Sequence, residues 1–254
     1  MQMNVFVCTS RGKALEPYLS RHMNSPYLIH TLPGASLQSI SIRTQQIIRK
    51  LENDNTKNAP FYITAGLPDI TKRFKNFKSN YEEVIFDGDS DNISDKIMRD
   101  IHRLADIIQA NNHKFIMCPI IPSNIEKWNS CRLSQRKTSH LNYSSSYPDM
   151  QAKLHSTILQ VNKEIISFNT GNSVITPFIA TGIIVSYKRK PSLPTSHKFS
   201  YKHLPDGVHL DSTIANQIAI KLVQCTQKNY NYVDKPKVAN PDTEGSSLRR
   251  SWRL

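Results

Sequence analysis

Short apolar runs alternate with helix-like stretches along most of the 254-residue chain, and this alternation constrains the fold more than any other feature. The apolar runs at residues 5–8, 27–32, 61–65 and 114–121 have the length and composition of buried strands. Strands that alternate with helices are typical of a parallel sheet covered by helices on both faces. We therefore expect an α/β fold around a central parallel sheet.

The regions between and after these strands predict mainly helices and loops. Apolar spacing predicts helices after the first two strands, over residues 93–110 and 150–168, and from Asp211 or Ser212 to about Lys228. Residues 84–86 suggest a short strand or a loop, and residues 174–177 a last strand. Polar composition predicts long loops over residues 128–150 and before Asp206. Residues 229–254 lack periodicity and predict a basic, disordered tail behind a domain of residues 1–228.

The chain is strongly basic. Its net charge of +13 favours contact with nucleic acid, an anionic membrane surface or an acidic partner. The lysines and arginines are scattered, and no recognised nucleic-acid-binding motif accompanies them, so a solvated basic surface is the simpler interpretation.

Cysteine usage and the N-terminus bear on the compartment. Cys8, Cys118, Cys131 and Cys225 are far apart and show neither metal-ligand spacing nor a disulfide framework, which favours a reducing environment. No stretch has the form of a signal peptide, and no apolar run is long enough to cross a membrane. We expect an intracellular protein, cytoplasmic or nuclear, that uses no metal and no cofactor.

Small-residue turns follow the first three predicted strands, at Ser10, Gly34 and Gly66. In parallel sheets, working residues collect at the carboxyl ends of the strands. If a helix opens at Arg11, the Ser10 amide points toward a developing oxyanion, and Gly34 exposes its own amide without a side chain.

Asp206 and His209 lie three residues apart, close to the last predicted helix. One tight turn would let Asp206 accept a hydrogen bond from the His209 ring and leave the other ring nitrogen free as a general base. The structural alternative is that Asp206 only shapes the turn, while Asp211 or Ser212 caps the helix. His203 is a further candidate for lining such a site, although a loop histidine is more often simply exposed. Trp128 and the loop at residues 128–150 could form a lid or a specificity wall, and the plainer interpretation is a mobile insertion.

Taken in order, Ser10, Gly34, Gly66-x-x-Asp69 and Asp206-x-x-His209 resemble the four signature blocks of the SGNH, or GDSL-type, hydrolases. The resemblance covers roughly residues 4–226 and is best at residues 33–37, 65–71 and 206–210. It implies a flavodoxin-like three-layer α/β/α sandwich and metal-independent hydrolysis of a small-molecule or lipid ester. The turn at residues 9–12 is similar to the form in divergent members carried by retroelements and other mobile elements.

The resemblance also implies residue roles. Ser10 would be the nucleophile, His209 the base and Asp206 its orienting partner. The amides of Ser10 and Gly34 would form the oxyanion hole. The third block would contact substrate through Gly66 and Asp69.

Two of the family's blocks are altered. The first block, Gly-Asp-Ser in the family, is Cys8-Thr9-Ser10 here, and Pro68 replaces an asparagine whose side chain donates to the oxyanion. Loss of one such donor typically lowers the rate by about 10²–10³.

Three alternatives accompany this hypothesis. The first is that Ser90 is the nucleophile, because Gly88-Asp89-Ser90 spells the family's first motif. This motif follows the blocks that it should precede, so we interpret it as an acidic loop that caps the next helix. A second alternative is a catalytically decayed SGNH-fold module, of mobile-element or viral origin, that binds nucleic acid or protein through its basic surface and tail. A nucleotide-binding flavodoxin-like domain is the third, but no phosphate-cradling glycine loop is present.

Overall fold

The computed structural model describes residues 3–76, 81–86, 89–135, 147–177, 179, 182–187 and 196–233. Within these residues four parallel strands form a central sheet in the order β2-β1-β3-β6. The strands are β1 (Asn4–Cys8), β2 (Tyr27–Thr31), β3 (Pro60–Thr64) and β6 (Lys114–Met117). The four apolar runs predicted as strands are therefore all present and parallel to their neighbours, whereas residues 84–85 belong to a strand of a separate antiparallel pair.

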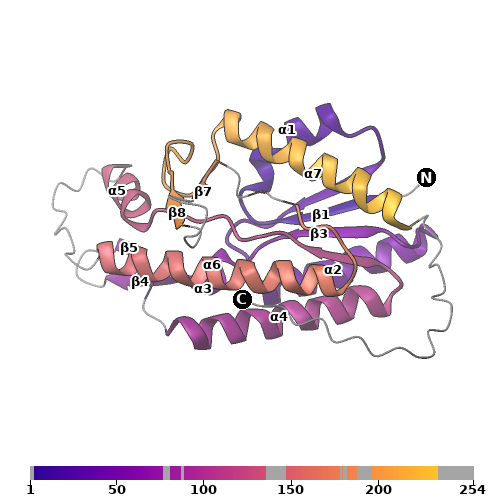
Figure 1. Cartoon of the computed structure of the whole chain (residues 1–254), viewed down its shortest axis with the longest axis horizontal. Helices are drawn as coiled ribbons and strands as arrows, with labels where there is room; N and C mark the ends of the chain where they lie inside the picture. Colours follow the sequence, from indigo (N-terminus) through magenta and orange to yellow (C-terminus); the bar gives the residue numbers. More distant parts are fainter. Residues whose placement is uncertain are drawn as a thin grey trace, which may run out of the picture.

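Helices cover both faces of the sheet (Figure 1). One face carries α1 (Gly12–His22) and α7 (Ser212–Val233), and the other carries α2 (Leu37–Asn53), α4 (Ser90–Ala110) and α6 (Tyr147–Gly171). This arrangement is the predicted three-layer α/β/α sandwich.

Strand geometry divides the interior into two cores, because successive side chains of a strand point to opposite faces. Val5 and Val7 pack among α2, α4 and α6, whereas Phe6 and Cys8 pack beneath α1 and α7. All four side chains are fully buried, as expected for a parallel strand covered on both sides.

The strand order places a topological switch point between β1 and β3. From β1 the chain turns through α1 to β2 on one side, and then crosses through α2 to β3 on the other. Loops that leave two such strands diverge and open a crevice at their carboxyl ends. The turns at Thr9–Arg11 and Ala65–Leu67 lie at this crevice.

Smaller elements surround the same end of the sheet, at the left of Figure 1. They are α3 (Leu67–Ile70), the antiparallel pair β4 (Lys72–Asn76) and β5 (Tyr81–Ile85), α5 (Ile125–Gln135), and the antiparallel pair β7 (Ile184–Tyr187) and β8 (Ser196–Phe199). Neither β4 nor the β7–β8 pair was predicted. β4 and β8 fall in polar stretches, and the short apolar run of β7 was included in the long loop expected before Asp206.

The start of the predicted loop at residues 128–150 is helical instead. The Asn124 side chain accepts the Lys127 amide at 2.7 Å and caps α5. From α5, Asn129 bonds both the amide and the carbonyl of Val84 on β5, each at 2.9 Å. A cap and contacts with a distant strand stabilise this helix, and periodicity detects neither. Residues 136–146 of the predicted loop lie outside the described residues.

The strand predicted to begin at Val174 is wrong. Residues 174–177 are irregular, and the backbone of Ile175 bonds the side chain of Asn229 on α7, with its amide at 2.7 Å and its carbonyl at 3.2 Å. A side-chain amide here replaces a sheet neighbour. The same contact buries Asn229, and α7 ends at Val233 rather than near Lys228. Residues 234–254 of the predicted tail lie outside the described residues.

The interpretation of Asp89 as a helix cap is confirmed. Its side chain accepts the amide of Asp91 at 3.1 Å at the start of α4.

Candidate active site

Asp206 and His209 form a hydrogen-bonded pair, as the sequence predicts. Nδ1 of His209 donates to Oδ2 of Asp206 at 2.5 Å. The amides of Val208 and His209 donate to the other carboxylate oxygen at 2.9 and 2.7 Å. Burial favours a higher pKa for Asp206, but the bonds from the His209 ring and these amides outweigh it and hold the pKa below its usual value. The pair is thus a carboxylate that fixes the imidazole tautomer.

A glycine shapes the turn between them. Gly207 has a φ of +84°, and a Cβ at this position would stand 2.5 Å from the carbonyl oxygen of Asn124. The Asn124 amide in turn donates to the Gly207 carbonyl at 2.8 Å. The turn therefore packs backbone to backbone against the start of α5, which only glycine permits.

An aromatic side chain of α5 lies against the imidazole. The ring centroids of Trp128 and His209 are 5.5 Å apart, and the guanidinium of Arg132 lies 5.2 Å from the Trp128 centroid. Trp128 is thus a wall beside His209, one of the two interpretations that its sequence position left open.

Ser10 and His209 open into one cleft of about 690 Å³. Its lining comes from the turns after β1, β2 and β3, from α5, and from the turn that carries His209. The described lining includes Thr9, Ser10, Arg11, Pro33, Gly34, Ser36, Ser39, Leu67, Pro68, Thr71, Arg73, Val84, Ser123, Ile125, Trp128, Arg132, Val208 and His209. Three predicted site residues, Ser10, Gly34 and His209, therefore share a cleft, and their catalytic roles stay predictions. Among the described residues no hydrogen bond joins Ser10 to His209.

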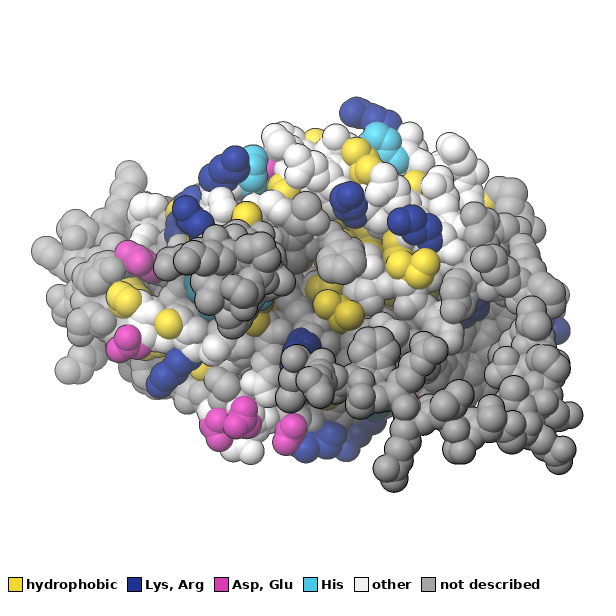
Figure 2. Space-filling view, viewed as in Figure 1, with side chains coloured by type: hydrophobic (Ala, Val, Ile, Leu, Met, Phe, Trp, Pro, Cys, Tyr) yellow, Lys and Arg dark blue, Asp and Glu magenta, His cyan; other side chains and the backbone are white. Residues whose placement is uncertain are grey.

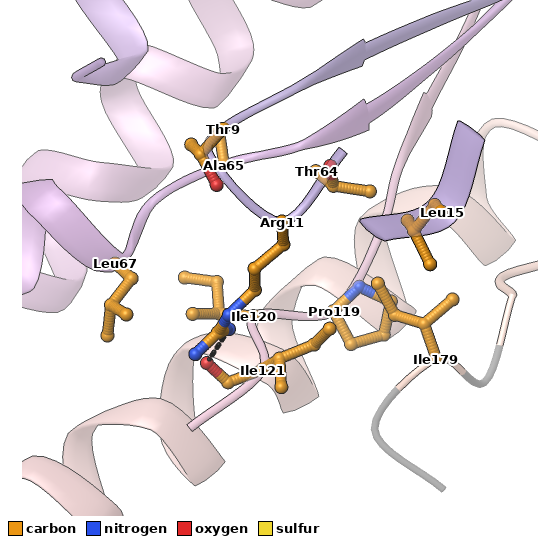
Figure 3. A pocket seen from close by; sticks show the side chains of 10 residues that line it. All are labelled: Thr9, Arg11, Leu15, Thr64, Ala65, Leu67, Pro119, Ile120, Ile121 and Ile179. Carbon is orange, nitrogen blue, oxygen red and sulfur yellow. Dashed lines mark hydrogen bonds between the residues drawn. The ribbon is translucent and has the colours of Figure 1, made fainter. Parts of the chain in front are cut away.

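Arg11, which follows Ser10, holds this part of the site together (Figure 3). Its side chain is only 6% exposed and donates to the carbonyls of Val208 at 2.9 Å, Ile121 at 2.6 Å and Pro122 at 3.0 Å. Burial lowers the pKa of Arg11 to about 10, a shift that nearby Asp206 opposes. The turn after β1 is thereby joined to the loop after β6 and to the turn of His209. Sequence reasoning missed this role, since an arginine after a turn normally indicates surface.

Asp69 and Gly66 shape the backbone next to the cleft and lie outside its described lining. Both carboxylate oxygens of Asp69 accept the amide of Leu37, at 3.1 and 3.0 Å, and so join the turn after β3 to the start of α2. Gly66, with φ +103°, begins α3. Neither residue is among the described lining of the cleft, and their assignment to substrate binding stays a prediction.

Pro68 and His203 have more definite positions. Pro68 lies in the first turn of α3 and lines the cleft, but it offers no donor. His203 does not line the cleft within the described residues; its Nδ1 bonds Oδ2 of Asp211 at 2.8 Å, while the other oxygen of Asp211 accepts the amide of Ile214 and caps α7.

Beyond the cleft, the described residues form neither a cluster of metal-ligating side chains nor, on the face in Figure 2, a concentration of charge. On the face shown in Figure 2, the described lysine and arginine side chains are dispersed and form no single patch. Across the described ranges, no three His, Cys, Asp or Glu side chains come together as metal ligands would. None of the described helices is long and apolar enough to span a membrane.

Solved structures of GDSL-type and related hydrolases share this parallel α/β/α fold. A GDSL-like lipase from Bacteroides thetaiotaomicron superposes with a TM-score of 0.54 over 91% of this chain and 88% of its own, at 14% identity. A protein assigned as an acylhydrolase from Bacteroides fragilis gives 0.55 over 91% and 88%, at 15% identity.

A protein assigned to the lipolytic G-D-S-L family from Desulfitobacterium hafniense gives a TM-score of 0.53 over 89% of this chain and 99% of its own, at 10% identity. No protein-family model and no curated protein matches the sequence. The chain therefore has the SGNH hydrolase fold, as its ordered motifs predict.

Proposed function

We propose that this protein hydrolyses carboxylic esters through Ser10, His209 and Asp206. The observation that carries the proposal is the Asp206–His209 pair, whose imidazole lines the same cleft as Ser10 and Gly34. A tautomer fixed at Nδ1 leaves Nε2 as the proton acceptor, which is the arrangement that a serine nucleophile requires. The ester hydrolases that share the fold add family-level support.

The reaction has two halves. Ser10 Oγ attacks the ester carbonyl while Nε2 of His209 takes its proton and later gives it to the leaving alcohol. Water then attacks the acyl-enzyme with the same base, and Ser10 is restored. Asp206 stabilises the imidazolium of each half-reaction. Ser10 and His209 come within hydrogen-bond reach when substrate fills the cleft, since such bonds commonly tighten only in the complex.

The oxyanion hole has two backbone donors, the amides of Ser10 and Gly34. Pro68 adds none. We therefore expect turnover about 10²–10³ below that of a comparable site with a third donor. The buried free thiols of Cys8, Cys118 and Cys225 support an intracellular, reducing location for this activity.

A fluorophosphonate probe tests the proposal, because it labels only an activated serine. Ser10 should be labelled in the folded protein, and Ser10→Ala should abolish both labelling and turnover. The matched control is Ser39→Ala, a serine that lines the same cleft and should keep both. Asp206→Asn should lower kcat by about 10²–10⁴ through the wrong imidazole tautomer.

The opposite result has its own interpretation. Folded protein that resists the probe, with Ser10→Ala unchanged in every assay, would indicate a module that has lost hydrolysis and binds a partner instead. Pro68 and the missing bond between Ser10 and His209 favour that second function. Binding of single-stranded or duplex nucleic acid that weakens steeply with salt would then identify the partner.

A further inference from the structure

The charge of the cleft points to the chemistry of its substrate. Three arginines, Arg11, Arg73 and Arg132, line it, and none of the described lining residues is an aspartate or a glutamate. The guanidinium N–H groups of Arg11 already donate hydrogen bonds to three backbone carbonyls, so this side chain is not the one that binds a ligand. The other two cations remain for a bound molecule.

Arg73 reaches the turn of the predicted oxyanion hole. Its Nη2 lies 3.0 Å from the point where a Cβ on Gly34 would stand. The side chain is exposed and makes no hydrogen bond or ion pair with any described residue. A guanidinium is always charged and presents a fork of donors, which matches the oxygens of a carboxylate or a phosphate. Its approach to Gly34 brings this unpaired fork beside the reacting carbonyl.

Arg132 supplies a second cation next to the base. Its guanidinium lies over Trp128, and Trp128 contacts His209. Stacking on an aromatic face holds an arginine in place while its N–H groups stay free at the edge. Asp206, the carboxylate that is paired with His209, accepts bonds from His209 and Val208.

We propose that the substrate is an ester carrying an anionic group, a carboxylate or a phosphate, and that Arg73 binds this group with Arg132 as a second contact. The inference rests on the proposed esterase function and specifies its substrate class. Arg73 thereby determines specificity, and it acts on substrate binding rather than on proton transfer.

The first test compares two chromogenic esters of matched size, mono-p-nitrophenyl succinate and neutral p-nitrophenyl isohexanoate. Wild-type protein should prefer the charged ester by roughly tenfold or more in kcat/KM, the range of one charge-assisted contact. Arg73→Gln should remove most of that preference through KM, and Arg73→Lys should keep part of it.

Arg103→Gln is the control for overall charge. Arg103 is an exposed arginine of α4 whose side chain is 76% exposed, and it does not line the cleft. This variant should retain the wild-type preference. A preference for the charged ester that Arg73→Gln leaves unchanged would overturn the proposal.

A second arm places the anion on the alcohol side. Butyryl glycerol phosphate is compared with butyryl glycerol by the release of butyrate. A preference in this arm alone assigns the anion to the alcohol as a phosphate, and a preference in the first arm alone assigns it to the acyl chain as a carboxylate. The absence of preference in both arms rejects the proposal.

A binding measurement separates failure of this inference from failure of the esterase function. The chain has two tryptophans, so Trp252→Phe leaves Trp128 in the cleft as the single fluorescent reporter. In a Ser10→Ala background, monomethyl succinate should bind more tightly than methyl isohexanoate, and Arg73→Gln should abolish the difference. This result would support the anion site even if no ester were hydrolysed, whereas equal binding of both ligands, together with equal binding of glycerol phosphate and glycerol, would reject it.

Discussion

At the scale of single residues, two aspartates have opposite pKa shifts because their surroundings differ. Asp206 receives a ring N–H and two amides, which outweigh its burial and lower its pKa. For Asp69, burial dominates the bonds from the Leu37 amide and raises the pKa to about 6, with a further increase from Asp100. Desolvation and hydrogen bonding act on both carboxyls, and their balance decides the sign.

Asp69 gives a pH prediction. Between about pH 4 and 6 the folded protein binds a proton at Asp69 that the unfolded chain releases, so the contribution of Asp69 to stability falls as pH rises through that range. Asp69→Asn keeps an acceptor for the Leu37 amide but cannot ionise. Its free energy of unfolding relative to wild type should therefore rise by on the order of 1 kcal/mol between pH 4.5 and 7.

Denaturant unfolding of both proteins across this pH range measures the difference. A difference that stays constant with pH, or that shrinks as pH rises, would contradict the assignment of a raised pKa to Asp69.

At the scale of elements, the turn that carries Asp206 and His209 depends on its contact with α5. Gly207 lets the two backbones meet, and the side chain of Trp128 from the same helix then reaches His209. The turn and the helix are thus one unit, although 74 residues separate another of their contacts, between Cys131 and Pro205.

Replacement of Gly207 should separate this unit. In Gly207→Ala, the new Cβ would stand 2.5 Å from the carbonyl oxygen of Asn124, and the alanine would have to adopt a φ of +84°, which is unfavourable for a residue with a side chain. We expect a loss of about 2 kcal/mol in the free energy of unfolding, together with weaker probe labelling of Ser10. Gly171→Ala is the matched control, since a Cβ there meets nothing within 4 Å. Chemical denaturation measures the stability of both variants. Equal stability would contradict the prediction, because it would show that the turn accommodates a Cβ with no loss in the free energy of unfolding.

At the scale of the whole molecule, Arg11 joins the beginning, the middle and the end of the chain. Its bond to Val208 spans 197 residues and its bond to Ile121 spans 110. A buried cation needs acceptors on all sides, and the three carbonyls serve in place of a full counter-ion.

Arg11→Met should leave those carbonyls without donors in a buried place. We expect about 2–4 kcal/mol of lost stability, since each bond involves a charged donor and the loss leaves buried acceptors unpaired. Arg103→Met, at an exposed position, should change stability by less than about 0.5 kcal/mol. Thermal and denaturant unfolding give the stability of both variants. If Arg11→Met were as stable as wild type, the bonds of Arg11 would not be what holds the three segments together.

Local pattern was sufficient for the frame of the fold. The runs at β1, β2, β3 and β6 are apolar because both faces of each strand are covered, and this leaves a signal within a few residues. Among the elements that were missed or misassigned, β4, β7 and β8 are short strands of two-stranded antiparallel pairs. α5 is stabilised by bonds between Asn129 and Val84, and the segment at Val174 by bonds to Asn229. A window of neighbouring residues around either of these two segments does not contain the distant partner.

The sequence by itself determined the α/β/α order, and it supplied the candidate site residues Ser10, Gly34, Asp206 and His209 from their place at predicted turns. Only the tertiary structure decided that Arg11 is buried, that Trp128 lies against His209 and that Arg73 reaches Gly34. Periodicity records which face of an element avoids water. Which loops then meet at the edge of the sheet depends on the packing of elements far apart in the chain.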